Sequence, residues 1–390
     1  MNSRFISLTL PFIVYNFIFF VSLFIINEGI YTSELQKETF DNSSQWVFLF
    51  YFLLSLSIFY IFYRISNLSS FSINLDVKEQ NFIIVFISLM AAFYSVPILI
   101  HGPAMLNGLN RYQFLLLKYV DFFNIKAWIS LTCYFLGILY FYRKRASIIL
   151  LICIVLLTLL YGEKASGPIL MFTFFISGLL MKMNVPIKVF SKITLLAMLV
   201  AMFLVFIYFI QLVLLDLETE RIINAFYIRL GRQSQIFWEL YNRFPFADYN
   251  VDKSSLFGNI FHSGDTISSM HYMMKIVMPI DEYIKHGGSL AGGYPSVLLL
   301  ITNNLVEFFL LSSLLSILYI SVVFFFFVSL FRFKYSMYFA PIFFFAFTVH
   351  LKVFQTGNLS LFLNEKYIVV LFCSILSFIL IQIKQYRKRM

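Results

Sequence analysis

Apolar stretches of about 20 residues alternate with short polar segments along almost the whole chain. Each stretch is long enough for an α-helix to cross a hydrocarbon core of about 30 Å. The pattern predicts membrane spans at 5–27, 46–63, 81–100, 126–142, 147–162, 168–181, 193–216, 296–331, 335–352 and 366–383. The predicted fold class is therefore all-α, a polytopic integral membrane protein with about 10 transmembrane helices. Residues 1–390 are expected to form a single polytopic membrane domain.

The apolar segment at 296–331 is too long for one straight helix across a bilayer. It begins directly after Pro295 and carries Asn303, Asn304 and Glu307 before a purely apolar stretch. We expect its first part to be a helix that packs inside the protein or re-enters from the outer side. The remainder is then the eighth span.

Lysine and arginine set the expected orientation. If the N-terminus is inside, fifteen of them fall in cytoplasmic segments, against seven in the short outer loops and their edges. Because positive residues concentrate on the cytoplasmic side, both termini are predicted to be cytoplasmic. The segment 217–295, 79 residues long, then becomes a large outer loop, too long to be only a connection.

Composition agrees with lipid as the main surroundings. The chain is 61% hydrophobic and 12% charged, whereas about a quarter of the residues of a soluble domain are charged. The net charge of +10 is spread over short clusters between apolar stretches, which indicates membrane orientation and not a nucleic-acid-binding face. Cys133, Cys153 and Cys373 all fall inside apolar stretches. No metal-ligand spacing exists, so neither a metal nor a cofactor is expected.

The first third of the large loop, residues 218–244, has the periodicity of an amphipathic helix. On a helical wheel Arg221, Arg229, Arg232 and Arg243 share an arc of about 80°. The opposite arc is apolar and includes Trp238, so we expect the helix to lie on the bilayer surface. Two roles for the arginines stay open: contact with anionic lipid headgroups, or a site for phosphate on a lipid-linked substrate.

The same loop supplies candidates for acid–base chemistry, side chains that can remove a proton from an attacking sugar hydroxyl: Asp248, Asp252, His262, Asp265, His271, Asp281, Glu282 and His286. The sequence alone does not choose among them. Within the predicted helix, Gly231 is a point at which it can break, and Glu239 lies on the arginine face. The loop ends with four glycines in seven residues, which lets the backbone approach a ligand closely.

Two more basic residues stand at the outer edges of predicted spans. Arg111 lies in an Asn-Arg-Tyr stretch after the third span, and Lys164 ends a Gly-x-Lys stretch after the fifth. With the long late loop, its segment from Arg229 through Trp238 and its glycine-rich end, this layout resembles the O-antigen polymerases (the Wzy type) over nearly the full length. The motifs of that family are weakly specific.

The resemblance implies a metal-independent glycosyltransferase at the periplasmic face of the bacterial inner membrane. It would transfer the growing glycan from undecaprenyl pyrophosphate onto the next lipid-linked repeat unit. Its partners would be that lipid-linked oligosaccharide, membrane lipids and a chain-length regulator protein. On this reading the catalytic candidates are His262, Asp265 and His286, and the pyrophosphate-binding candidates are Arg229, Arg232, Arg111, Arg221, Arg243 and Lys164.

Two alternatives are weighed against the polymerase. An O-antigen ligase uses the same donor, but ligases typically carry a His followed by Asn in the large outer loop, and His262, His271 and His286 are not followed by Asn. A transporter of lipid-linked oligosaccharides is the non-enzymatic alternative. Transporters tend to show repeat-related halves and polar positions at mid-membrane, and the sequence shows no internal repeat.

Overall fold

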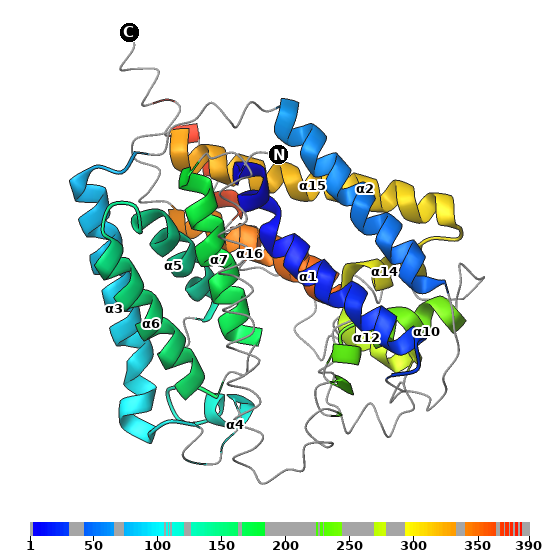
Figure 1. Cartoon of the computed structure of the whole chain (residues 1–390), viewed down its shortest axis with the longest axis horizontal. Coiled ribbons are helices and arrows are strands. Elements are labelled where there is room, and N and C mark those ends of the chain that lie inside the picture. Colours follow the sequence, from blue (N-terminus) through cyan, green and yellow to red (C-terminus); the bar gives the residue numbers. More distant parts are fainter. Residues whose placement is uncertain are drawn as a thin grey trace. The chain divides into compact units, whose positions relative to one another are not determined.

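Every element of the described chain is a helix (Figure 1). The computed structural model describes residues 3–30, 43–65, 74–104, 107, 109, 111–120, 126–162, 166–183, 224, 227–228, 230–243, 269–277, 293–332, 340–363, 367–369, 371–373, 375–376, 379–380 and 383. Within these ranges no residue forms a strand, in agreement with the predicted all-α class.

The chain divides into two compact units. Unit 1 comprises Met1–Pro11 and Asn67–Leu217, and unit 2 comprises Phe12–Ser66 and Glu218–Met390. Helix α1 (Ser3–Asn27) contributes its beginning to unit 1 and the rest to unit 2.

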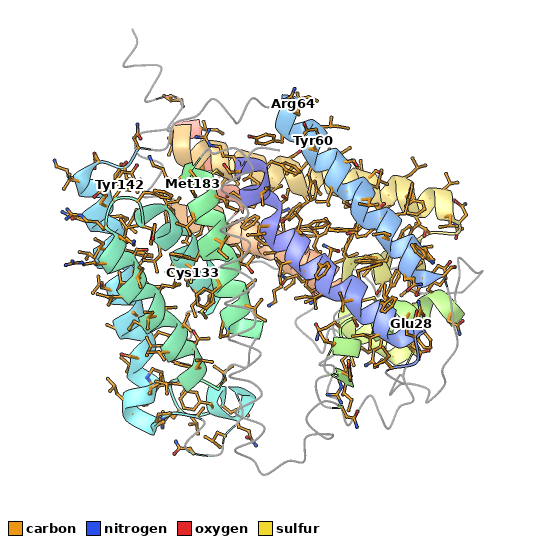
Figure 2. The ribbon with its side chains drawn as sticks, in the orientation of Figure 1. Glu28, Tyr60, Arg64, Cys133, Tyr142 and Met183 are labelled. Atoms are coloured by element: carbon orange, nitrogen blue, oxygen red, sulfur yellow. The ribbon has the colours of Figure 1, made fainter. Side chains whose placement is uncertain are left out.

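Unit 1 is built around a fully buried helix. It contains α3 (Val77–His101), α4 (Arg111–Leu115), α5 (Lys126–Leu139), α6 (Lys144–Leu160) and α7 (Ser166–Met183). The 14-residue α5 is buried from Ile129 to Leu139; Figure 2 shows Cys133 on this helix. Such a helix rises about 21 Å, less than a hydrocarbon core. It lies in the core of unit 1, and the span predicted at 126–142 stays a prediction.

Helices α5 and α7 pack with their backbones in contact. A Cβ added at Gly137 would lie 2.1 Å from the Phe175 carbonyl oxygen, and one added at Gly178 would lie 2.0 Å from the Tyr134 carbonyl oxygen. Small residues allow this approach between helices in lipid, where association depends on close packing more than on hydrophobicity. The two glycines therefore set the spacing of the unit 1 core.

The beginning of α1 is fastened to α7 by polar groups. Arg4, only 4% exposed, donates from Nε to the Met181 carbonyl oxygen at 3.3 Å. Ser7 Oγ donates to the Ser177 carbonyl oxygen at 2.6 Å, and Ser177 donates back to the Ser7 carbonyl oxygen. These bonds satisfy polar groups that lipid cannot.

Unit 2 contains the remaining helices. They are α2 (Ser44–Ile65), α10 (Gln235–Arg243), α12 (Ser269–Val277), α14 (Gly293–Ile301), α15 (Leu305–Arg332), α16 (Ala340–Thr356) and the short 3-10 helix η4 (Leu359–Leu363). α2 and α15 run side by side (Figure 1) and are joined by a 2.9 Å hydrogen bond between the Ser55 and Ser316 hydroxyls. Large apolar side chains such as Phe50 and Leu314 stay exposed on them, as expected for surfaces that face lipid.

The predicted division of 296–331 into two helices is confirmed. α14 is buried from Gly293 to Leu300, and the chain breaks at Thr302–Asn304 before α15 begins. The Glu307 carboxylate accepts from the Asn303 backbone N–H at 2.9 Å, while Asn304 Oδ1 accepts from the Glu307 N–H at 2.8 Å. This reciprocal cap starts α15 and gives Glu307 a structural role.

Four helices of the described chain are long and apolar enough to cross a membrane. They are Ser3–Asn27, Ser44–Ile65, Val77–His101 and the Leu305–Val323 part of α15. They support a polytopic membrane protein, while the count of ten spans and the placement of both termini stay predictions. The predicted span 193–216 and most of the predicted loop 217–295 lie outside the described residues.

The glycine contact in unit 1 leads to a first prediction. Gly178→Ala should lower the free energy of unfolding by about 3 kcal/mol, because its methyl group would overlap the α5 backbone and overpack the core. Thermal unfolding of the purified protein in detergent measures this loss. Ala92→Val, at an exposed position on α3, is the matched control and should change stability little. Equal stability of the two variants would contradict the close contact.

Candidate functional site

The structure describes only part of the predicted site. Arg111 begins α4 in unit 1, Arg232 lies in a turn of unit 2, and Arg243 ends α10. The other predicted site residues lie outside the described residues: Arg221, Arg229, Lys164, His262, Asp265 and His286. Within unit 2, Arg232 precedes the short helix α10 and Arg243 is its last residue.

The turn that carries Arg232 is fixed to helix α1. The Arg232 N–H donates to the Ile228 carbonyl oxygen at 3.0 Å, and the helix ends there. Ser22 Oγ, on α1, donates to the Gly231 carbonyl oxygen at 3.0 Å, and Ser234 Oγ donates to Ser22 Oγ at 2.6 Å. Both serines are fully buried, whereas the Arg232 side chain is half-buried. The turn therefore holds the backbone of Arg232 at a defined position against α1.

The structure corrects the prediction of a single amphipathic helix in this segment. The sequence predicts one helix over 218–244, but residues Arg232–Ser234 form a turn and α10 begins at Gln235. Gly231 precedes the turn, at the point where the sequence allows a break. From Ser234 to Leu240 every residue is buried, so this segment packs inside unit 2 and does not lie on the bilayer surface. Arg232, in the turn, and Arg243, at the end of α10, are consequently not on one continuous helix.

Aromatic and polar contacts attach α10 to the ends of α1 and α2. The indole N–H of Trp238 donates to Asn27 Oδ1 at 2.6 Å. The ring of Phe237 lies 5.9 Å from each of the rings of Phe19 and Phe48. Asn27 is in the last turn of α1, just before exposed Glu28, which Figure 2 labels. α10 is thus seated where the α1 helix ends.

A buried carboxylate lies on the other side of α10. Phe237 packs against α1 and α2, and on a helix Gln235 and Glu239, one turn apart, lie on the face roughly opposite to Phe237. Both are completely buried, and α12 and α14 also pack on α10. Among the described acidic residues only Glu239 is buried, because Glu28, Asp76 and Glu307 are exposed and Glu79 is half-buried. An ionisable group inside a membrane protein is a marker of function.

Sequence reasoning treats Glu239 only as a neighbour of the arginines. The wheel that groups it with them assumes an unbroken helix on the membrane, so its burial is invisible to that analysis. The signal in the sequence is the spacing itself: Gln235 and Glu239 lie four residues apart in a segment that is otherwise apolar from Ile236 to Leu240.

A second buried titratable group lies near the end of α16. His350 is 3% exposed, and the Tyr367 hydroxyl lies 3.3 Å from both of its ring nitrogens. In the predicted topology His350 lies near the outer end of the span 335–352. Within the described residues no three His, Cys, Asp or Glu side chains come together as a group that could hold a metal ion.

Taken together, the described part of the site has a fixed cationic turn, a buried carboxylate and no acidic metal cluster among the described residues. A guanidinium suits phosphate oxygens, because its planar donors bind two oxygens at once and it keeps its charge at any physiological pH.

The seat of α10 leads to a second prediction. Asn27→Leu should lower the free energy of unfolding by about 1–3 kcal/mol, because the buried Trp238 N–H loses its acceptor. Thermal unfolding and the emission wavelength of Trp238 report the change. Asn107→Ala removes an exposed hydrogen bond to the His101 carbonyl oxygen and should change stability by no more than about 0.5 kcal/mol. If Asn27→Leu unfolds at the same temperature as the wild-type protein, the packing of α10 on α1 through this hydrogen bond would be refuted.

Comparison with known proteins adds no relative: no protein-family model, no curated protein and no solved structure matches the chain.

Proposed function

We propose that the protein is an O-antigen or surface-polysaccharide polymerase of the bacterial inner membrane. The proposal takes both termini as cytoplasmic and α10 as periplasmic. The protein would transfer the growing glycan from undecaprenyl pyrophosphate onto the next lipid-linked repeat unit. The observation that supports it most is the Arg232 turn, fixed to α1 through Ser22 and followed, within the next helix α10, by buried Glu239. A cation for a pyrophosphate and a carboxylate near it are what this transfer requires.

The chemistry follows from the charges that develop. The acceptor hydroxyl oxygen attacks the anomeric carbon of the donor glycan, and the bond from that carbon to the pyrophosphate oxygen breaks. The hydroxyl proton passes to a base, and the leaving pyrophosphate gains negative charge. Arg232 is proposed to stabilise this charge, together with Arg229, Arg111, Arg221, Arg243 and Lys164. His262, Asp265 and His286 stay the proposed acid–base groups.

The fixed turn matters because catalysis needs donors that are already in place. A side chain on a mobile loop would have to be ordered at the moment of reaction, and that ordering opposes the stabilisation it provides. Ser22 and Ser234 remove this cost for the Arg232 backbone. A headgroup contact alone would not need a turn anchored by two buried serines.

A transporter of lipid-linked oligosaccharides is the second candidate, and α14 is the observation that favours it. This nine-residue helix is buried within unit 2 and too short to span a bilayer. Transporters often bind substrates at such interrupted helices. The two proposals differ in whether glycosidic bonds are made.

Deletion of the gene separates these functions. The polymerase proposal predicts lipopolysaccharide core that bears a single repeat unit, because units are made and ligated but not joined. Electrophoresis of lipopolysaccharide shows this directly. Bare core with lipid-linked polymer would indicate a ligase, bare core with single units in the cytoplasmic leaflet would indicate a transporter, and a full ladder would refute all three.

A variant of the fixed turn tests the site. Arg232→Ala should slow chain extension by about 100-fold, the equivalent of about 3 kcal/mol of transition-state stabilisation, while the protein still inserts. Repeat units added per minute in membranes measure the effect, and Arg232→Lys should recover part of it. Arg64→Ala, at the exposed end of α2 that Figure 2 labels, is the control. A normal ladder from Arg232→Ala would eliminate the proposed role.

A further inference from the structure

Four tyrosines meet in the core of unit 2. They come from α1 (Tyr15), α2 (Tyr51), α14 (Tyr294) and α15 (Tyr319). The phenol groups of Tyr15, Tyr294 and Tyr319 all lie close enough to that of Tyr51 to interact electrostatically. We call these four residues the tyrosine cluster.

The hydroxyls of the cluster fall into two kinds. Tyr15 donates to the Gln355 carbonyl oxygen at the end of α16, and the Tyr51 hydroxyl lies beside the Ser55 side chain. The hydroxyls of Tyr294 and Tyr319, by contrast, are buried and form no hydrogen bond within the described part of the chain. Both residues are only 1% exposed.

Packing does not explain why two buried hydroxyls of the cluster form no hydrogen bond within the described part of the chain. The Tyr294 and Tyr319 rings pack against the same Phe354 ring, at 4.8 and 4.6 Å between centroids, and phenylalanine would make those contacts equally well. The chain uses Phe freely, with 51 Phe against 24 Tyr. A buried hydroxyl without a partner destabilises a fold. These two hydroxyls therefore suit a partner from outside the chain.

Two glycines allow the start of α14 and the end of α16 to pack closely beside the cluster. Gly293 has a φ of +69°, and a Cβ there would lie 2.7 Å from the Phe19 ring. Gly357 has a φ of +71°, and a Cβ there would lie 2.5 Å from the Gly293 carbonyl oxygen. The start of α14 and the end of α16 can touch only because both positions lack a side chain. That contact brings the start of α14, which carries Tyr294, next to the end of α16, which carries Gln355.

The chemistry of the cluster selects its ligand. None of its side chains is charged, so a charged ligand would be buried without a counter-charge, which is costly. A phenol both donates and accepts a hydrogen bond, as does a sugar hydroxyl.

We infer that the tyrosine cluster is a binding site for an uncharged, hydroxyl-bearing group, a sugar residue of the lipid-linked oligosaccharide, held by Tyr294 and Tyr319. Naming the sugar rests on the proposed function. The site is separate from the Arg232 turn: Ser22 meets the turn, whereas Tyr15 lies two turns earlier on the same helix α1.

Substitution by phenylalanine tests the inference with two readouts. Tyr294→Phe and Tyr319→Phe each remove an unsatisfied hydroxyl and keep the ring. Without substrate, each should raise the Tm of the purified protein by about 2 °C. Chain extension by the same variants in membranes should fall at least 10-fold, since the sugar loses a partner. Greater stability with lower activity is a combination that a purely structural role does not produce.

Tyr161→Phe is the matched control. Its hydroxyl is also buried and makes no hydrogen bond within the described residues, but it lies in unit 1, where its ring stacks on Tyr94 at 4.0 Å. This variant should gain Tm and extend chains at the wild-type rate. The inference is overturned if Tyr294→Phe and Tyr319→Phe extend chains normally, or if they lose Tm.

A binding measurement separates failure of this inference from failure of the proposed function. The probes are the repeat-unit oligosaccharide released from its lipid, and undecaprenyl pyrophosphate without sugar. Free oligosaccharide should raise the Tm of the wild-type protein but not that of the Tyr294→Phe, Tyr319→Phe double variant, whether or not the protein polymerises. A shift with the lipid pyrophosphate alone, or an equal shift in the double variant, would contradict the sugar site.

Discussion

The seating of α10 on the end of α1 is the contact on which the rest of unit 2 depends. Ser22 and Ser234 join the two segments through buried hydroxyls, Trp238 donates to Asn27, and Phe237 packs edge-on against the stacked rings of Phe19 and Phe48. Polar groups inside an apolar bundle must find partners within the protein. Ser22 and Asn27 on α1, with Ser234 in the turn itself, meet that requirement and fix where the Arg232 turn lies.

The same seat explains why an acidic residue is tolerated in the interior. Once Phe237 packs against α1 and α2, the helix geometry places Glu239 on the opposite side of α10, where it is buried. The carboxylate thus stands within two helical turns of Arg232 along the chain. Its burial arises from the fold around α10 and not from any local preference of the residue.

Periodicity predicts the parts of this fold that depend on single helices. The apolar stretches at 5–27, 46–63 and 81–100 form helices long enough to cross a membrane, and the polar residues Asn303, Asn304 and Glu307 mark the break before α15. Periodicity fails where contacts with neighbouring helices determine the structure. The 218–244 segment looks amphipathic on a wheel, but contacts with α1 and α2 bury α10. Nor does periodicity show that Gly137 and Gly178 meet, or that Tyr294 and Tyr319 share Phe354, because these contacts join residues far apart in sequence.

The central claim is that the Arg232 turn works while fixed to α1, and a disulfide tests it directly. The Ser22 and Ser234 hydroxyls are 2.6 Å apart, so Ser22→Cys with Ser234→Cys should form a bond in the oxidising periplasm. Peptide mass spectrometry detects the bond, and the lipopolysaccharide ladder reports chain extension by the locked protein. The account predicts a formed disulfide and a wild-type ladder. A pair that never bonds, or a locked protein that no longer extends chains, would contradict it.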